Sequence, residues 1–525
     1  MDEEAIILRL KDTSSVIENV RRISGNPGIS LGVMHHGKVI YRANYGYRDM
    51  DSRLPPTSDT VFPIASMTKA LIAASFARLV DAGQLTWETK LSTLVPEYRQ
   101  MNDQIKCPEL VSKANLIDLL AHRLGLTAGN NFWSQKQQQV LIDKTETANI
   151  VGSLQPLAPF RSKFMYLNWG YGLAGEILEN LTKAGLEEHF QRTLFQPLGM
   201  TNTTMAVPPS DNYVKCYMTL SNGTPSQIPP TAYEAGKARA GAGACKSTVN
   251  DLMVLYKAWM EAEAGGPDAT DSPFKRVHDT WTPHIEISGK TKYGLGWVIT
   301  ELPSQLGLVG LNEYECPELP VVAKGTKPQR LIYSQGSVCG SLSAVYLLPE
   351  TQSAIVVLGN SFDLTDTPDW ISQILLEALL DAPEPNDFPP IVEKTAAKAL
   401  SHHQPTVEQL AKEKVLGTKH RPLEDYFGRY YNRMGNFFLE ISAHESGLKM
   451  CPQGFENTAY FLEHYHYDTF AWPCDRDAEA KLGLFPQFSI GLHKVSFEAD
   501  ESGEIISCNW QIDKAIPQGE VFTKK

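Results

Sequence analysis

The sequence predicts an α+β fold, an antiparallel sheet flanked by helices, followed by a small all-β domain. Strand patterns come early in the chain, helical patterns occupy the middle from Ser66 to about residue 200, and strands and a helix return before Leu380. Elements that are segregated in this way are typical of α+β folds. After Leu380 the pattern changes to short strands at regular spacing, which is typical of a separate barrel or sandwich.

The first part of the chain predicts a helix and then a hairpin. Residues 4–22 have the apolar spacing of an amphipathic helix, which Gly25-Asn26-Pro27-Gly28 ends. Two strand-like runs, Ile29–Met34 and Lys38–Tyr45, follow on either side of His35-His36-Gly37. Further strands are expected at Tyr293–Ile299, Gln329–Tyr333, Leu342–Leu348 and Ser353–Leu358, and a helix at Trp370–Leu380.

The last part of the chain predicts a linker and a β domain. Asp381–Pro390 holds four prolines in ten residues, and a helix is expected over 392–416. Strands are then expected at Tyr426–Tyr431, Phe437–Ser442, Tyr460–His466, Phe488–Leu492, Val495–Glu498 and Ile505–Ile512. We therefore expect domains at residues 1–385 and 423–525, joined by a linker with a helix at 386–422.

Composition excludes several classes of function. The net charge is −12 and no run of Lys and Arg occurs, so nucleic acid is not an expected partner. No apolar stretch approaches the ~20 residues of a membrane span, so no membrane association is expected. The acidic start lacks the pattern of a signal peptide, and the eight cysteines form no C-x-x-C pair, so we expect free thiols and a cytoplasmic location. His464 and His466 share a strand face without a nearby third ligand, and neither a metal nor a cofactor is expected.

Ser66-Met67-Thr68-Lys69 is the first candidate for chemistry. If Ser66 opens the helix that follows, Lys69 lies on the same face, because residues i and i+3 are neighbours on a helix. Serine needs a nearby base to act as a nucleophile, and a buried lysine with a lowered pKa can be that base. The motif alone also occurs by chance.

Two further motifs come later in the chain. Tyr166-Leu167-Asn168 precedes a helical pattern; a tyrosine can move protons beside a lysine, and an asparagine can contact an amide or ester. A core tyrosine with a turn asparagine is the alternative. Ser334-Gln335-Gly336-Ser337 ends an apolar strand, where Gly336 allows close approach and a backbone N–H can stabilise an oxyanion. A plain strand with a glycine bulge is the alternative.

Taken in order, these motifs resemble those of the serine β-lactamase and penicillin-binding protein superfamily, in its branch of class C β-lactamases, D-aminopeptidases and esterases. The resemblance runs from about residue 14 to 380. Further stretches that carry it are Pro27–Val33, Val61–Lys69, Leu79–Leu85, Leu119–Leu126, Pro197–Thr203, Tyr293–Trp297 and Leu347–Glu350. Arg239–Gly243 resembles a Gly-rich loop near the family's pocket, although an ordinary loop is the alternative. The strands after Leu423 resemble a lipocalin-like barrel found in some relatives.

The resemblance implies a β-lactamase/transpeptidase-like domain and a role for each motif. Ser66 would be the acylated nucleophile, Lys69 would take or hold its proton, and Tyr166 would act as base or proton relay. Asn168 would contact the substrate. The backbone N–H groups of Ser66 and Ser337 would form the oxyanion hole beside Gly336.

One position departs from the family. The third motif usually begins with Lys or His, and here Ser334 stands in that place. Its hydroxyl cannot hold a substrate carboxylate as a cation does, which argues against β-lactam and peptidoglycan substrates. Uncharged esters, lactones or thioesters stay compatible with the motif.

These observations predict a serine hydrolase or acyltransferase that acts on a small ester, lactone or amide, with a place in secondary metabolism as one option. The alternatives are a D-aminopeptidase-like amidase and a non-catalytic scaffold with the same fold. The expected partner is a small acyl substrate, and a homo-oligomer stays open.

Overall fold

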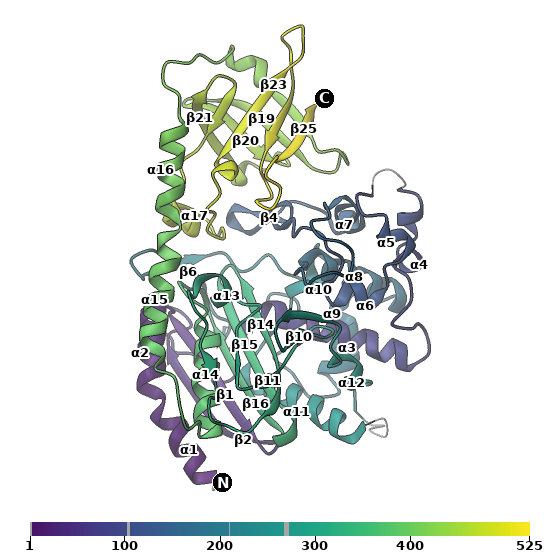
Figure 1. The fold of residues 1–525 in the computed structure, drawn as a ribbon, viewed down its shortest axis with the longest axis vertical. Helices are drawn as coiled ribbons and strands as arrows, with labels where there is room; N and C mark the ends of the chain where they lie inside the picture. The colour runs from purple at the N-terminus through teal and green to yellow at the C-terminus, as the bar shows by residue number, and fades with distance from the viewer. Residues whose placement is uncertain (1–2, 102–104, 209–210, 267–271) are drawn as a thin grey trace.

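An eight-stranded antiparallel sheet forms the centre of the first domain (Figure 1). The computed structural model describes residues 3–101, 105–208, 211–266 and 272–525. In spatial order the strands are β2 (Lys38–Gly46), β1 (Gly28–His35), β16 (Ser353–Gly359), β15 (Ser341–Leu348), β14 (Gln329–Val338), β11 (Val298–Leu302), β10 (Thr291–Tyr293) and β9 (Ile285–Ser288). The predicted α+β fold is confirmed.

Helices cover both faces of this sheet. One face packs against α1 (Glu3–Asp12), α2 (Ser14–Ser24) and α14 (Thr367–Leu380), and the other against α3 (Thr68–Asp81), α8 (Asn168–Thr182) and α11 (Val249–Gly265). Side chains of a strand alternate between faces, so on β15 Val345 and Leu347 join the α3 core while Tyr346 and Leu348 join the α14 core. Because both faces are buried, the central strands are apolar throughout.

Shorter elements complete the domain. The helices are α4 (Leu91–Leu94), α5 (Glu109–Ser112), α6 (Leu116–Leu120), α7 (Thr147–Ser153), α9 (Leu186–Phe190), α10 (Ala240–Gly243), α12 (Val277–Thr280) and α13 (Asn312–Glu315). The short strands are β3 (Phe62–Pro63), β4 (Ser134–Gln135), β5 (Gln139–Val140), β6 (Cys216–Thr219), β7 (Pro225–Ile228), β8 (Lys246–Ser247), β12 (Ser304–Gln305), β13 (Val321–Val322) and β17 (Ser361–Phe362). Within the described ranges, no helix has both the length and the apolar character that crossing a bilayer requires.

Two predictions for this domain are wrong in detail. The helix expected over residues 4–22 is divided into α1 and α2, with Thr13 between them. The strand expected at Tyr293–Ile299 is interrupted by a tight turn at Gly294–Trp297, with Tyr293 at the end of β10 and Val298 at the start of β11. Gly296 in that turn has φ +82°, and a Cβ there would overlap the backbone of Lys69 and Ala70. The turn is therefore fitted closely against the start of α3.

The C-terminal domain is a closed barrel rather than a sandwich. Its strands are β18 (Gly428–Tyr431), β19 (Phe438–His444), β20 (Gly447–Pro452), β21 (Tyr460–His466), β22 (Thr469–Ala471), β23 (Lys494–Ala499), β24 (Ile505–Trp510) and β25 (Glu520–Lys524). β18 pairs with both β19 and β25, which leaves no free edge. The sequence did not predict β20, β22 and β25, and the strand expected at Phe488–Leu492 is wrong because Ile490–His493 is a short 3-10 helix. A lipocalin relationship stays a prediction.

Two helices join the domains along one side of the molecule (Figure 1). α15 (Phe388–Ser401) packs on α2 and α14 through Phe388 and Val392, and α16 (His403–Glu413) continues to the barrel. The barrel also contacts the first domain directly: Asp513 Oδ2 accepts from the Thr127 hydroxyl at 2.6 Å, and Arg476 donates to the Thr219 carbonyl at 3.0 Å. The predicted boundaries at residues 385 and 423 stay a prediction.

A buried carboxyl group lies where β17 leads into α14. Asp363 is 1% exposed, and its Oδ2 accepts hydrogen bonds from Asn26 Nδ2 at 2.9 Å and from the Thr367 hydroxyl at 2.7 Å. Burial raises the pKa of Asp363 to about 7, because the neutral hydrogen bonds only partly offset the loss of hydration.

The raised pKa predicts a pH-dependent contribution to stability. Between the usual aspartate pKa of 3.8 and the folded value of about 7, the folded chain holds a proton that the unfolded chain releases. The free energy of unfolding should therefore fall as pH rises through this range, by up to about 1.4 kcal/mol per pH unit from this one group. Asp363→Asn stays neutral, and we expect it to flatten this slope in urea titrations at pH 4.5 to 7.

The exposed Asp12 provides the matched control, and Asp12→Asn should leave the slope as in the wild type. Equal slopes for wild type and Asp363→Asn would contradict the assignment.

Candidate functional site

Ser66 lies where the chain enters α3, in a 3-10 turn formed by Ala65–Met67. The segment is fixed from the sheet side, because Ser341 Oγ donates to the Pro63 carbonyl at 2.8 Å and Ser343 Oγ donates to the Ile64 carbonyl at 3.0 Å. Ala65 has φ +47°, a left-handed conformation that costs roughly 1–2 kcal/mol for a residue other than glycine. The backbone strain beside Ser66 is thus held in place by β15.

Lys69 lies one turn later on α3 and is 1% exposed. Its Nζ donates to Ser66 Oγ at 2.8 Å, to Asn168 Oδ1 at 2.9 Å and to the Ala242 carbonyl at 2.8 Å. Burial, and then the positive charge of Arg239, hold the pKa of Lys69 well below its ordinary value.

This arrangement suits a neutral amine. A neutral lysine has two N–H groups and one lone pair, and the two carbonyl oxygens from Asn168 and Ala242 accept two N–H groups. The lone pair is then left facing Ser66 Oγ, where it can accept the hydroxyl proton. The site therefore places a desolvated amine directly beside a serine hydroxyl.

Tyr166 lies against the same lysine. Its ring centroid is 4.9 Å from Lys69 Nζ and 4.3 Å from the ring of His122. Burial raises the pKa of Tyr166, and a hydrogen bond with Ser66 offsets this only in part. Tyr166 is consequently a neutral phenol and a proton donor at physiological pH. His122 Nδ1 accepts the backbone N–H of Leu167 at 3.0 Å, which fixes the segment that carries Tyr166.

Asn168 is the first residue of α8 and connects the lysine to the cavity. Its Oδ1 accepts from Lys69 and its Nδ2 donates to Asn130 Oδ1 at 3.5 Å. The amide is thus oriented with its oxygen toward Lys69.

Strand β14 passes the serine on the opposite side. Ser337 lines the cavity together with Ser66. Gly336 approaches so closely that a Cβ would overlap the Ile64 carbonyl oxygen and the Ser343 hydroxyl. Ser334 is buried at 6% exposure and does not appear among the described residues that line the cavity. The structure therefore brings Ser66, Lys69, Tyr166, Asn168, Gly336 and Ser337 together, while Ser334 is buried two residues before Gly336 on the same strand.

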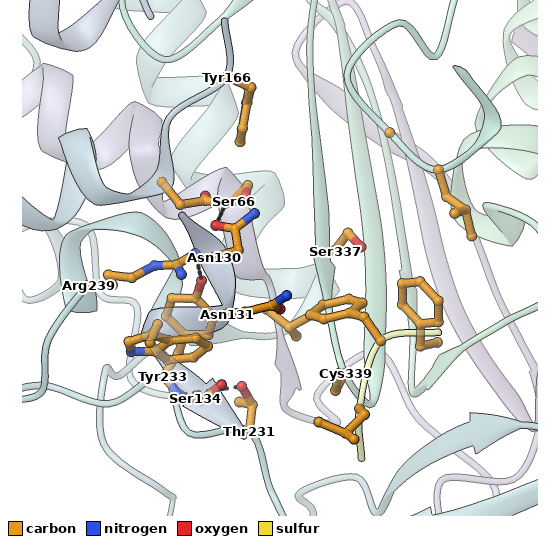
Figure 2. Close-up of a pocket in the computed structure, with 18 of the residues that line it drawn as sticks. Ser66, Asn130, Asn131, Ser134, Tyr166, Thr231, Tyr233, Arg239, Ser337 and Cys339 are labelled. Atoms are coloured by element: carbon orange, nitrogen blue, oxygen red, sulfur yellow. Dashed lines mark hydrogen bonds between the residues drawn. The ribbon is translucent and has the colours of Figure 1, made fainter. Parts of the chain in front are cut away.

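The cavity in front of Ser66 has a volume of about 380 Å³ and two unlike sides. Asn130, Asn131, Tyr233 and Arg239 form a polar side (Figure 2). The other side is mainly apolar and includes Leu308, Val309, Leu311, Tyr314, Val338 and Phe362.

The barrel contributes part of the wall. Gly483, Leu484, Phe485 and Gln487 lie in the segment between β22 and β23, and Lys514 lies after β24. The ring of Phe485 contacts that of Phe362, with centroids 5.1 Å apart. The cavity is therefore shared by both domains.

Sequence reasoning missed much of this wall. Besides the motif residues and Cys339, which we expected to border the pocket and which lines it, only the Arg239–Gly243 loop was singled out, through the family resemblance, and its arginine was not given a role. The barrel residues have no motif, and only the tertiary structure brings them to Ser66. In the part of the chain that the structure describes, no cluster of three His, Cys, Asp or Glu side chains is suited to a metal ion.

Comparison with known protein families identifies two regions. Residues 15–379 match the β-lactamase family model, and residues 412–523 match a domain of unknown function, DUF3471. The first match covers more than half of the chain and includes Ser66, Lys69, Tyr166, Asn168, Gly336 and Ser337, whereas the barrel residues of the cavity wall lie in the second.

Individual relatives are distant. Protein flp of Staphylococcus aureus strain COL is 22% identical over 355 residues, which are 66% of this chain and 62% of that protein. This chain thus spans less than two thirds of that relative. A β-lactamase of Escherichia coli strain K12 is 25% identical over 344 residues, 64% of this chain and 84% of that protein.

Solved structures agree on the fold. The octameric penicillin-binding protein homologue from Pyrococcus abyssi has a TM-score of 0.57 at 20% identity, with 100% of both chains covered. A β-lactamase/D-alanine carboxypeptidase from Pseudomonas syringae has a TM-score of 0.55 at 21% identity, covering 73% of this chain and 100% of that one.

The close packing at Gly336 can be tested by adding one methyl group. In Gly336→Ala the Cβ overlaps Ile64 O and Ser343 Oγ, so either β14 or the Ser66 segment has to move. We expect the free energy of unfolding to fall by about 1–3 kcal/mol in a urea titration.

Gly185→Ala is the matched control, because φ is −63° and the nearest atom to the new Cβ is Glu179 Oε1 at 3.8 Å. It should cost less than about 1 kcal/mol. Equal losses in the two variants would show that the approach of β14 is not tight.

Proposed function

The chain belongs to the β-lactamase family, and from that premise we propose that it is a serine hydrolase or acyltransferase with Ser66 as the acylated residue. The observation that carries the proposal is the 2.8 Å contact between Lys69 Nζ and Ser66 Oγ, made by a lysine that is 1% exposed. A desolvated amine with two fixed carbonyl acceptors is suited to take the serine proton.

The proposed reaction has two halves. Ser66 Oγ attacks the substrate carbonyl as Lys69 takes its proton, and the backbone N–H groups of Ser66 and Ser337 stabilise the oxyanion. Tyr166 donates a proton to the leaving group, with Lys69 resupplying it. Water or an acceptor alcohol or amine then attacks the acyl-enzyme as Lys69 takes its proton, and Lys69 returns that proton to Ser66 Oγ as the serine leaves.

The substrate is proposed to be a small ester, lactone or amide. The volume of about 380 Å³ suits a small molecule, and the hydroxyl of Ser334, in the place where the family usually has Lys or His, fits a substrate outside the β-lactams and peptidoglycan. A role in secondary metabolism and a D-aminopeptidase-like amidase activity stay predictions. The eight cysteines are all unpaired and buried, which supports the cytoplasmic location that we propose.

A non-catalytic scaffold is the competing proposal. The octameric neighbour supports assembly of copies of this chain. The contacts among Ser66, Lys69 and Asn168 favour catalysis, because a buried lysine without a carboxylate is costly to keep and a scaffold has no use for it.

The acyl-enzyme can be tested by intact-mass spectrometry. After incubation with a fluorophosphonate and with p-nitrophenyl esters, we expect one adduct on the wild type and none on Ser66→Ala, because the variant lacks the nucleophile. Ser75→Ala is the matched control in the same helix, since its buried hydroxyl lacks a hydrogen-bond partner among the described residues. An adduct that persists in Ser66→Ala, or none on the folded wild type, would refute the mechanism.

The base can be identified from the pH dependence of kcat/KM. If Lys69 is the base, the rate rises as it loses its proton and levels off well below the ordinary lysine pKa of 10.5. If tyrosinate were the base, the rate would keep rising beyond the ordinary tyrosine pKa of 10.0, because the pKa of Tyr166 is raised.

Lys69→Met should slow acylation by about 10²–10⁴-fold. It should also remove the rise of kcat/KM with pH that we assign to the loss of a proton from Lys69. Melting curves of the variant provide the folding control. A profile that is still rising above pH 10 would exclude Lys69 as the base.

A further inference from the structure

The cavity in front of Ser66 carries positive charge in a protein that is acidic overall. Arg239 and Lys514 line it, and no Asp or Glu is found among the described lining residues. The whole chain has 60 acidic and 48 basic residues and a net charge of −12. The cavity therefore has the opposite sign from the chain around it, which favours an anionic ligand.

Arg239 is the buried member of this pair. It is 3% exposed, and its Nη2 donates to the Tyr233 hydroxyl at 2.8 Å. Its Nε and Nη1 have no hydrogen-bond partner among the residues that the structure describes. The guanidinium lies 4.7 Å from the Trp133 ring and 5.7 Å from the Tyr233 ring.

Burying a guanidinium lowers the stability of the folded protein unless a negative group lies beside it. Burial lowers the pKa of Arg239, and the described groups that offset this are the neutral phenols Tyr233 and Tyr166. Aromatic contacts compensate in part. The remaining N–H groups match a carboxylate, which accepts two parallel hydrogen bonds from one arginine.

The backbone holds this side chain in place at a cost. Arg239 has φ +64°, where glycine would be favoured, and the backbone of Arg239 packs so closely on α8 that a Cβ on Gly172 would lie 3.0 Å from its Cα. Strained residues are often retained where they serve a site. Figure 2 shows the guanidinium extended into the cavity toward Asn130 and Tyr233, with Tyr166 on the far side of Ser66.

We propose that Arg239 receives a carboxylate on the acyl portion of the substrate, so that the enzyme acts on half-esters or half-amides of dicarboxylic acids. The proposal rests on the proposed function. Tyr166 is the proton donor to the leaving group, and Arg239 lies across Ser66 from it, so the group that meets Arg239 is the part that stays bound to Ser66. The expectation of an uncharged substrate, which depended on Ser334, is replaced by this assignment.

The apolar side of the cavity fits the same substrate. Methylene groups of the acyl chain can pack on side chains such as Leu311 and Val338, while the terminal carboxylate reaches Arg239. The aliphatic chain also keeps bulk water from screening the ion pair.

The test compares charged and neutral acyl chains of equal length. The substrates are p-nitrophenyl half-esters of succinate, glutarate and adipate, against p-nitrophenyl butyrate, valerate and hexanoate. We expect wild-type kcat/KM to favour the best half-ester over its neutral partner by at least about tenfold. Arg239→Gln should abolish that ratio, chiefly through KM, and Arg239→Lys should keep part of it.

Lys113→Gln is the matched control, because it removes a positive charge at an exposed position outside the residues that line the cavity. Solvent screens that charge, so the ratio should change less than about threefold. A wild type that hydrolyses neutral esters without preferring half-esters would overturn the proposal, as would an unchanged ratio in Arg239→Gln. An Arg239-dependent preference for 4-acetoxybenzoate over 4-acetoxybenzamide would place the carboxylate on the leaving group and overturn the acyl assignment.

A binding measurement separates this proposal from the proposed function. Ser66→Ala lacks the nucleophile, and calorimetry with glutarate at physiological salt reports the anion site alone. Binding to Ser66→Ala that is lost in Ser66→Ala/Arg239→Gln supports the site even if no ester is turned over. Absence of binding in a folded Ser66→Ala protein, together with equal turnover of charged and neutral esters, would refute it.

Discussion

The burial of Lys69 is the constraint on which the site depends. An ammonium group with 1% exposure and, among the described residues, no carboxylate partner is unfavourable, and burial therefore holds the pKa of Lys69 well below its ordinary value. The carbonyl oxygens that orient this amine come from α8 and α10, and the serine that it faces comes from the turn before α3. Because three separate elements meet at one nitrogen atom, each of them has to be placed by the packing of the whole domain.

Much of the fold followed from local pattern. Apolar runs such as Leu342–Leu348 and Ser353–Leu358 predicted strands that are present as β15 and β16, since both faces of the sheet are buried. The turn at Gly294–Trp297 could not be predicted in the same way, because its shape is set by contact with the backbone of Lys69 and Ala70. The closure of the barrel could not be predicted either. β18 and β25 are the first and last strands of the domain, and neither sequence indicates that the two strands pair.

The site was predictable only where a motif lies within one segment. Ser66 and Lys69 are three residues apart on a helix, so their contact follows from helical geometry. Asn168, Tyr166 and Ser337 were predicted only because their motifs follow one another in the same order as in the family. Nothing in the sequence next to these residues indicates that they lie near Ser66. Arg239 and the segment containing Phe485 join the cavity through tertiary contacts across more than one hundred residues.

The segment between β22 and β23 has a broader consequence. It lies in a different domain from the serine, yet Leu484 and Phe485 form part of the wall around it. Part of the wall that shapes the cavity is thus encoded in a different domain from Ser66. Sequence changes in the barrel can therefore alter which molecules fit the cavity while the residues around Ser66 stay the same. The choice of ligand and the chemistry at the serine can then change independently during evolution.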